Sequence, residues 1–237
     1  MADVVLDNVT RTYSGAPYAA VNHVSLTIPD GCFAVLAGPH ASGKSTLIRL
    51  IAGLEAPDSG HILFDGVDVT RQPSASRNCA LVFHSYALYP HLSIADNLGF
   101  ALRVSGVDEQ TIAQRVAEVA ALLTIEPYLD RNPRGLAPDV RQKVALGRAL
   151  VRQPNLLILD EALATLPTQL ADSMRGQLRD LHDHFGITTL YATARVDEAE
   201  ELDAYTVVLD RGKVSAQGTY SDVMRSYRHI DRLAPKA

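Results

Sequence analysis

One segment restricts the fold of this 237-residue chain more than any other. Residues 38–46 read Gly-Pro-His-Ala-Ser-Gly-Lys-Ser-Thr, which matches the pattern G-x-x-x-x-G-K-S/T. The apolar run at residues 32–37 precedes it and is typical of a strand buried on both faces of a parallel sheet. Residues 47–52 follow it and can continue as a helix. A strand, a glycine loop and a helix in this order favour an α/β fold.

This loop is predicted to bind phosphate. Backbone N–H groups at the start of a helix point toward phosphate oxygens, and the helix dipole favours negative charge there. Lys44 would add a positive charge beside the β- and γ-phosphates, and Ser45 would offer its hydroxyl to Mg²⁺. The flanking strand and helix argue against the alternative, a glycine turn with a stray lysine. The residues assigned to nucleotide binding in this loop are Gly38, Pro39, His40, Ala41, Ser42, Gly43, Lys44, Ser45 and Thr46.

Two adjacent acids form a second signal. The apolar residues 156–159 run directly into Asp160 and Glu161. An acid at the carboxyl end of a buried strand lies where ligands bind in an open α/β sheet. Asp160 is predicted to hold Mg²⁺ through water, and Glu161 is predicted to polarise an attacking water as the catalytic residue. The competing interpretation is a pair of solvated acids that cap the next helix, and the phosphate loop disfavours it.

Strand and helix patterns alternate along the chain. This alternation indicates a largely parallel sheet covered by helices. In the middle of the sequence, Ile112, Val116, Val119 and Leu123 recur at helical spacing after the N-cap candidate Asp108. This helical middle is predicted to be inserted into the α/β fold. The expected strands are residues 4–9, 24–28, 32–37, 61–66, 156–159, 188–191 and 206–209.

Composition argues against several other classes of protein. The formal net charge is −5, whereas nucleic-acid binders usually carry a basic excess, so no nucleic acid is expected as a partner. No apolar run approaches the roughly 18 residues of a membrane span, and the acidic N-terminus lacks the layout of a signal peptide. Cys32 and Cys79 are too few for a disulfide framework. The expected place is the cytoplasm, with any link to a membrane made through a partner.

With these motifs, the chain resembles the nucleotide-binding subunit of ABC transporters, and most closely the ATPase subunits of sugar importers. The likeness covers almost the whole sequence. Tyr13 lies where the family places an aromatic side chain that stacks on adenine. Residues 81–92 resemble the Q-loop and the surface that receives a transmembrane coupling helix. Residues 141–150 resemble the helix after the signature motif, and residues 160–167 resemble Walker B running into the D-loop.

The resemblance implies an α/β P-loop NTPase (RecA-like) core with an N-terminal antiparallel β subdomain and an inserted helical subdomain. One ATP-binding domain would comprise a core at residues 1–84 and 154–237 and a helical subdomain at residues 85–153. The implied cofactors are ATP and Mg²⁺. The implied partners are transmembrane permease subunits, a second ATP-binding subunit of the same or another kind, and a solute-binding protein, which places the chain at the inner face of the cell membrane. Sugar-importer ATPases usually carry an extra C-terminal regulatory domain, and because the sequence ends at Ala237 we expect none here.

The signature motif departs from the family pattern. The family reads LSGGQ, and the aligned residues here are Leu136, Ala137, Pro138, Asp139 and Val140. Ala137 removes a hydroxyl, and Pro138 removes a backbone N–H. Asp139 brings a negative charge toward a triphosphate, and like charges about 4 Å apart cost roughly 1–4 kcal/mol.

Other motifs depart as well. His84 stands at the Q-loop glutamine and is a candidate metal contact, while Ala194 stands at the switch histidine. Arg195, the next residue, is a candidate substitute cation. Pro167 stands at a D-loop aspartate, and Ala41 replaces a glycine that the general pattern does not require. Three further acids, Glu198, Glu200 and Glu201, are expected to form a solvated face.

These differences divide by function. The parts that hold ATP and Mg²⁺ within one subunit are retained, whereas the parts that sense the γ-phosphate across a dimer are altered. Removing one positioned donor costs other enzymes about 10²–10³ in rate, so slow hydrolysis with retained binding is expected. Two interpretations stay open: an importer ATPase that is slow or depends on a better partner, and a non-hydrolysing ATP-binding scaffold or regulatory subunit. A small-molecule kinase would need an acceptor-binding lid, and the sequence suggests none.

Overall fold

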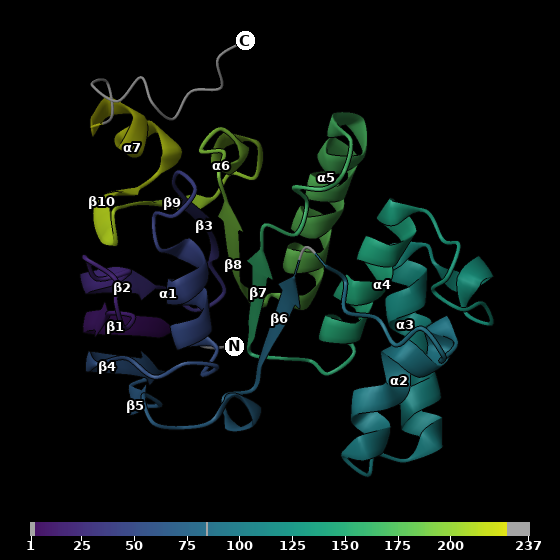
Figure 1. Ribbon diagram of the computed structural model, residues 1–237. Coiled ribbons are helices and arrows are strands. Elements are labelled where there is room, and N and C mark those ends of the chain that lie inside the picture. Colours follow the sequence, from purple (N-terminus) through teal and green to yellow (C-terminus); the bar gives the residue numbers. More distant parts are fainter. Residues whose placement is uncertain (1–2, 84, 227–237) are drawn as a thin grey trace.

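The computed structural model describes residues 3–83 and 85–226, which form two sheets and a group of helices (Figure 1). The smaller sheet is antiparallel, with its strands in the order β2-β1-β4-β5. Its strands are β1 (Val4–Arg11), β2 (Val21–Ile28), β4 (Ser59–Phe64) and β5 (Val67–Asp68). The antiparallel β subdomain expected near the N-terminus is therefore confirmed.

The larger sheet has six strands in the order β10-β9-β3-β8-β7-β6. All neighbours are parallel except the antiparallel pair of β10 and β9. The strands are β3 (Phe33–Ala37), β6 (Cys79–Phe83), β7 (Leu156–Asp160), β8 (Thr188–Thr193), β9 (Tyr205–Asp210) and β10 (Lys213–Gly218). Every residue of β3, β7 and β8 is buried, as in strands covered on both faces.

Helices cover the larger sheet and form a separate group beside it (Figure 1). α1 (Lys44–Ile51) follows β3, and α5 (Thr168–Phe185) follows β7. Two short helices, α6 (Glu198–Glu201) and α7 (Tyr220–Ser226), lie near the C-terminal strands. The separate group consists of α2 (Ile94–Val104), α3 (Glu109–Leu123) and α4 (Pro138–Leu150), which come between β6 and β7 in the chain.

The larger sheet separates two apolar cores. Ala34 and Leu36 of β3 pack in the core that includes α1 and the smaller sheet. Val35 and Ala37 pack in the other core, which includes residues of α2 to α5. This division follows from the period of two along a strand, which sends successive side chains to opposite faces. The predicted α/β fold with an inserted helical unit is confirmed, while the boundaries at residues 84–85 and 153–154 stay a prediction.

Local signals account for the helical group. The Ser93 side chain accepts a hydrogen bond from the Asp96 N–H at the start of α2. The Asp108 side chain accepts one from the Thr111 N–H, which confirms the predicted N-cap of α3. The apolar residues expected along α3 are buried. Among the described residues, none of the helices is both long and apolar enough to cross a membrane.

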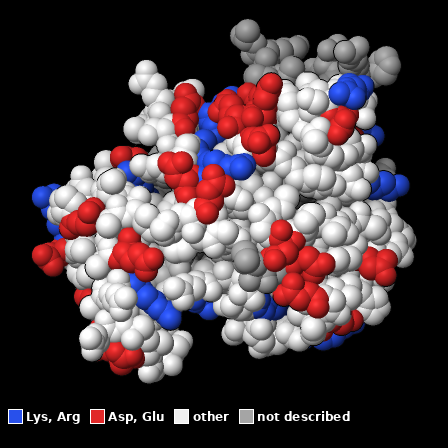
Figure 2. All heavy atoms as spheres, turned by 180° about the vertical axis from the view of Figure 1, so that it is seen from behind, with Lys and Arg blue, Asp and Glu red and all other residues white. Residues whose placement is uncertain are grey.

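Charged side chains are unevenly spread over the surface. Acidic side chains form several clusters on the face opposite to that of Figure 1 (Figure 2). This agrees with the formal net charge of −5. An anionic ligand would gain nothing from the overall charge of this chain, so any attraction for it must come from local groups.

Gly147 of α4 sits where the three helices of the separate group meet. A Cβ atom there would lie 2.8 Å from Leu98 Cδ2 and 3.0 Å from Leu123 Cδ1. We expect Gly147→Ala to destabilise the fold by about 1–3 kcal/mol through overpacking. Gly176→Ala on α5 is the matched control, because nothing lies within 4 Å of its added Cβ, and it should stabilise by about 0.5–1 kcal/mol. Urea unfolding followed by circular dichroism measures both, and a stabilised Gly147→Ala would contradict the packing described.

Candidate functional site

The predicted phosphate loop connects β3 to α1 at the carboxyl end of the larger sheet (Figure 1). Two glycines allow its close packing. A Cβ on Gly38 would lie 2.2 Å from the Leu209 carbonyl oxygen, and one on Gly43 would lie 2.2 Å from the Ala20 carbonyl oxygen. Gly43 also has a φ of 105°, which L side chains rarely adopt. The loop backbone is therefore fixed against β9 and against the segment before β2.

The ammonium group of Lys44 lies inside this loop, and its side chain is only 4% exposed. Nζ donates to the carbonyl oxygens of Gly38 at 2.8 Å and Pro39 at 3.0 Å. It also lies 3.6 Å from Glu161 Oε1. Burial lowers the pKa of Lys44, and the carboxylates of Glu161 and Asp160 oppose that shift.

The two acids predicted at the end of β7 lie beside the loop. The Ser45 hydroxyl donates to Asp160 Oδ1 at 3.2 Å. Asp160 is 7% exposed, and Glu161 follows it with a φ of 48°. β7 and β3 flank β8 in the sheet, so their carboxyl ends meet at one edge. The structure thus brings together Lys44, Ser45, Asp160 and Glu161.

The donor groups here fit a phosphate ligand and a hard cation. The buried Ser42 hydroxyl has no hydrogen-bond partner within the described part of the chain. Ser45 and Asp160 supply oxygen donors, and Mg²⁺ is usually held by one or two carboxylates together with substrate phosphates. No group of three or more His, Cys, Asp or Glu residues that could hold a metal occurs in residues 3–83 and 85–226. A Mg²⁺ ion held by Ser45 and Asp160 would take its other oxygen ligands from water or from a bound phosphate.

The other residues predicted to bind nucleotide lie within the loop or beside it. His40 and Ala41 are exposed at its tip, and Pro39 is half-buried. Tyr13 lies between β1 and β2, and its hydroxyl oxygen is 3.3 Å from Thr46 Oγ1. An aromatic ring therefore lies beside the phosphate loop. His84, the candidate metal contact, lies outside the described residues.

The residues aligned with the signature motif lie at the start of α4, in the helical group rather than beside α1 (Figure 1). Ala137 is the N-cap residue, and no side chain caps this helix. Pro138 occupies the first turn, and Asp139 adds an acid there. A helix start with its own carboxylate is less suited to an anion than one with free N–H groups and a hydroxyl.

A cavity of about 220 Å³ lies between β6, α2 and α4. Arg148 of α4 lines it, donating from Nη1 to the Ala87 carbonyl oxygen at 2.6 Å. Its Cζ lies 5.4 Å from the centroid of the Tyr89 ring. Burial lowers the pKa of Arg148. Sequence reasoning gave Arg148 no role of its own, because the cavity arises only when three separate elements meet.

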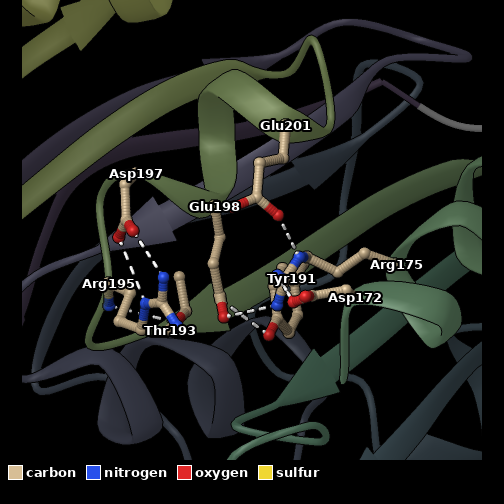
Figure 3. Close-up of polar contacts among 8 residues, drawn as sticks. All are labelled: Asp172, Arg175, Tyr191, Thr193, Arg195, Asp197, Glu198 and Glu201. Atoms are coloured by element: carbon tan, nitrogen blue, oxygen red, sulfur yellow. Dashed lines mark hydrogen bonds and ion pairs between the residues drawn. The ribbon is translucent and has the colours of Figure 1, made fainter. Parts of the chain in front are cut away.

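The segment after β8 holds Ala194 and Arg195, and Figure 3 shows Arg195 beside Asp197. Arg195 Nη2 donates to Asp197 Oδ2 at 2.5 Å, and its Nε donates to Oδ1 at 3.3 Å. This pairing raises the pKa of Arg195 and lowers that of Asp197. For Arg195 to act as a substitute cation, this ion pair would have to open.

Glu198 corrects an expectation from the sequence, because it is 5% exposed rather than part of a solvated face. Its Oε2 accepts from the Tyr191 hydroxyl at 2.9 Å, and its Oε1 accepts from Arg175 Nη1 at 3.1 Å (Figure 3). Arg175 is itself buried and also contacts Asp172 and Glu201. The sequence feature that could have predicted this cluster is Arg175, which lies on the apolar side of α5. A buried arginine needs a carboxylate partner.

Burial and the Glu198 carboxylate raise the pKa of Tyr191, so its hydroxyl keeps its proton and donates a hydrogen bond to Glu198. Tyr191→Phe leaves one oxygen of a buried carboxylate without its donor. We expect it to lower the free energy of unfolding by about 1.5–3 kcal/mol. Tyr18→Phe is the matched control, because Tyr18 is 83% exposed. Equal urea midpoints for both variants would show that the Tyr191 contact does not stabilise the fold.

Comparison with known protein families identifies this arrangement. The family model described as ABC transporter matches residues 21–164. The chain is 45% identical over 212 residues to the diacetylchitobiose uptake system ATP-binding protein MsiK of Streptomyces coelicolor, covering 90% of this chain and 56% of that protein. It is 42% identical over 229 residues to the sn-glycerol-3-phosphate import ATP-binding protein UgpC 1 of Rhizobium johnstonii, covering 97% and 61%. The chain thus spans less than two thirds of the length of these relatives.

Solved structures share the fold. The structure of cbiO1 from Clostridium perfringens, described as part of the ABC transporter complex cbiONQ, matches with a TM-score of 0.86 at 25% identity. The match covers 94% of this chain and 90% of that one. The dimeric ATP-binding cassette MJ0796 bound to ADP and Pi matches with a TM-score of 0.79 at 24% identity, over 92% of this chain and 98% of that one.

Proposed function

This chain belongs to the ABC transporter family, and on that premise we propose that it is the ATP-binding subunit of a sugar-type importer. The observation that carries the proposal is the meeting of Lys44 and Ser45 with Asp160 and Glu161 at one end of the sheet. The names of the relatives, which include uptake of diacetylchitobiose and import of sn-glycerol-3-phosphate, support an importer of sugars or related solutes.

In this proposal the phosphate loop holds the triphosphate of ATP. Its backbone N–H groups and the start of α1 face the phosphate oxygens. Lys44 exchanges its contacts with two carbonyl oxygens and Glu161 for contacts with a more strongly charged anion. Ser45 and Asp160 hold Mg²⁺, which neutralises phosphate charge when bound. Tyr13 stacks on the base, and the loop residues from Gly38 to Thr46 complete the site.

We further propose that hydrolysis is impaired. Glu161 would orient the attacking water, and for that its carboxylate must leave the ammonium group of Lys44. The side chains expected to assist are altered: Ala194 has no imidazole, and Arg195 is engaged by Asp197. The start of α4, which would face the ATP of a second subunit, has no side-chain cap and carries Asp139. The second candidate function, a non-hydrolysing scaffold or regulatory subunit, draws on these same features.

The proposed partners are transmembrane permease subunits, a second ATP-binding subunit and a solute-binding protein. The cavity beside Arg148 supports docking of a permease segment, because Tyr89 and Phe100 line it and are each 36% exposed. Tyr86, Ala87 and Tyr89, which were expected on a docking surface, contribute to its wall. This contact would hold the chain at the inner face of the cell membrane.

Nucleotide binding is tested by titrating labelled Mg-ATP into wild type and Lys44→Ala. Loss of a charged hydrogen-bond donor should weaken binding about ten- to a hundredfold. Lys213→Ala, at an exposed lysine of β10, is the matched control and should bind as wild type does. Equal affinity of wild type and Lys44→Ala would refute the assignment of the loop.

Phosphate release separates the two candidate functions. A slow release by wild type that Glu161→Gln abolishes supports an impaired ATPase. Ala194→His returns an imidazole to the end of β8 and should raise that rate by at least about tenfold. Release that is equal in wild type and Glu161→Gln is contamination, and it would favour the non-hydrolysing subunit.

A further inference from the structure

Tyr13 contacts side chains from three separate segments of the chain. Its hydroxyl donates to Glu55 Oε2 at 2.7 Å, in the loop after α1. The same oxygen lies 3.3 Å from Oγ1 of Thr46, in the first turn of α1. The Arg11 guanidinium lies over the Tyr13 ring, with 5.2 Å between Cζ and the ring centroid.

The direction of these hydrogen bonds follows from proton count. A phenol has one proton, and the ionised Glu55 carboxylate can only accept. The Thr46 hydroxyl must therefore donate to the Tyr13 oxygen, which gives a chain from Thr46 through Tyr13 to Glu55. Because Thr46 belongs to the phosphate loop, the position of the ring is tied to that of the loop.

Glu55 is the centre of this group. Its Oε2 lies 3.7 Å from Arg11 Nε, and its Oε1 lies 3.5 Å from Arg49 Nη1. Arg11 is anchored a second time, since its Nη1 donates to Asp58 Oδ1 at 2.8 Å. The side chains of Arg11 and Glu55 are only 29% and 21% exposed. Arg11 and Glu55, two of the partners of Tyr13, are thus each held by further contacts.

We propose that Glu55 and Arg11 are positioning residues that hold the Tyr13 ring ready to stack on a nucleotide base. Arg11 covers one face of the ring, so a base stacks on the other face. Glu55 fixes the hydroxyl, so the ring does not lose rotational freedom when the base arrives. This inference rests on the proposed function, in which the phosphate loop binds ATP.

The test compares two probes, Mg-ATP and inorganic triphosphate, by displacement of labelled ATP. Glu55→Ala and Tyr13→Phe should each weaken Mg-ATP binding about three- to tenfold. Neither should change the affinity for inorganic triphosphate, which has no base. Glu55→Gln should lose less than Glu55→Ala, because its amide oxygen still accepts from Tyr13. Arg11→Gln should also weaken Mg-ATP binding alone.

The double variant Tyr13→Phe/Glu55→Ala provides the sharpest result. If Glu55 acts through the Tyr13 hydroxyl, the affinity of the double variant for Mg-ATP should equal that of the single variant with the lower affinity. Additive losses would show that Glu55 acts by another route and would overturn the proposal. Glu118→Ala, at an exposed position of α3, is the matched control and should bind both probes as wild type does.

Two other outcomes are distinguishable. If Glu55→Ala lost equal affinity for Mg-ATP and for inorganic triphosphate, Glu55 would act on the phosphate loop and not on Tyr13. If Glu55→Ala bound Mg-ATP as wild type does, Glu55 would have no role in binding. Either result would overturn the inference. If wild type bound neither probe, or if Lys44→Ala bound both equally well, the proposed function itself would fail.

Discussion

The ammonium group of Lys44 is withdrawn from water at the carboxyl end of a parallel sheet, and its charge has to be compensated there. Two backbone carbonyl oxygens and Glu161 do this in the present structure. The carbonyl oxygens can face Lys44 only because Gly38 and Gly43 let the loop pack against neighbouring backbone. A ligand that replaces these contacts must carry more negative charge than they do, and the polyphosphate that we propose as the ligand meets this requirement.

Two further groups of contacts lie near the carboxyl ends of strands in the larger sheet. On one side, Thr46 links the loop to Tyr13 and Glu55, so the parts that we propose to bind the base and the phosphates form one hydrogen-bonded unit. On the other, Glu198 and Arg175 fasten α6 to α5 just beyond the segment that follows β8. The parts that we propose to bind nucleotide within one subunit thus lie beside well-connected side chains, whereas the start of α4 belongs to a separate helical group.

The sequence allows prediction of those features that depend on local patterns. The phosphate loop, the acids ending β7 and the Asp108 cap each depend on a few consecutive residues and on general rules for strand and helix ends. Contacts between distant residues that belong to no recognised motif could not be predicted. The burial of Glu198 is accompanied by Arg175, 23 positions away, and the role that we propose for Glu55 requires Tyr13, 42 positions away. β6 was not among the predicted strands, because its five residues carry no turn signal and pair only with the distant β7.

A structure determined from crystals grown at saturating Mg-ATP tests the central claim most directly. The account predicts the triphosphate on the loop, with Lys44 Nζ in contact with phosphate oxygens and Glu161 released from it. It also predicts density for a cation beside Ser45 and Asp160. If Lys44 kept its contacts with Glu161 and the Gly38 carbonyl oxygen while the nucleotide bound elsewhere or not at all, the account would be contradicted.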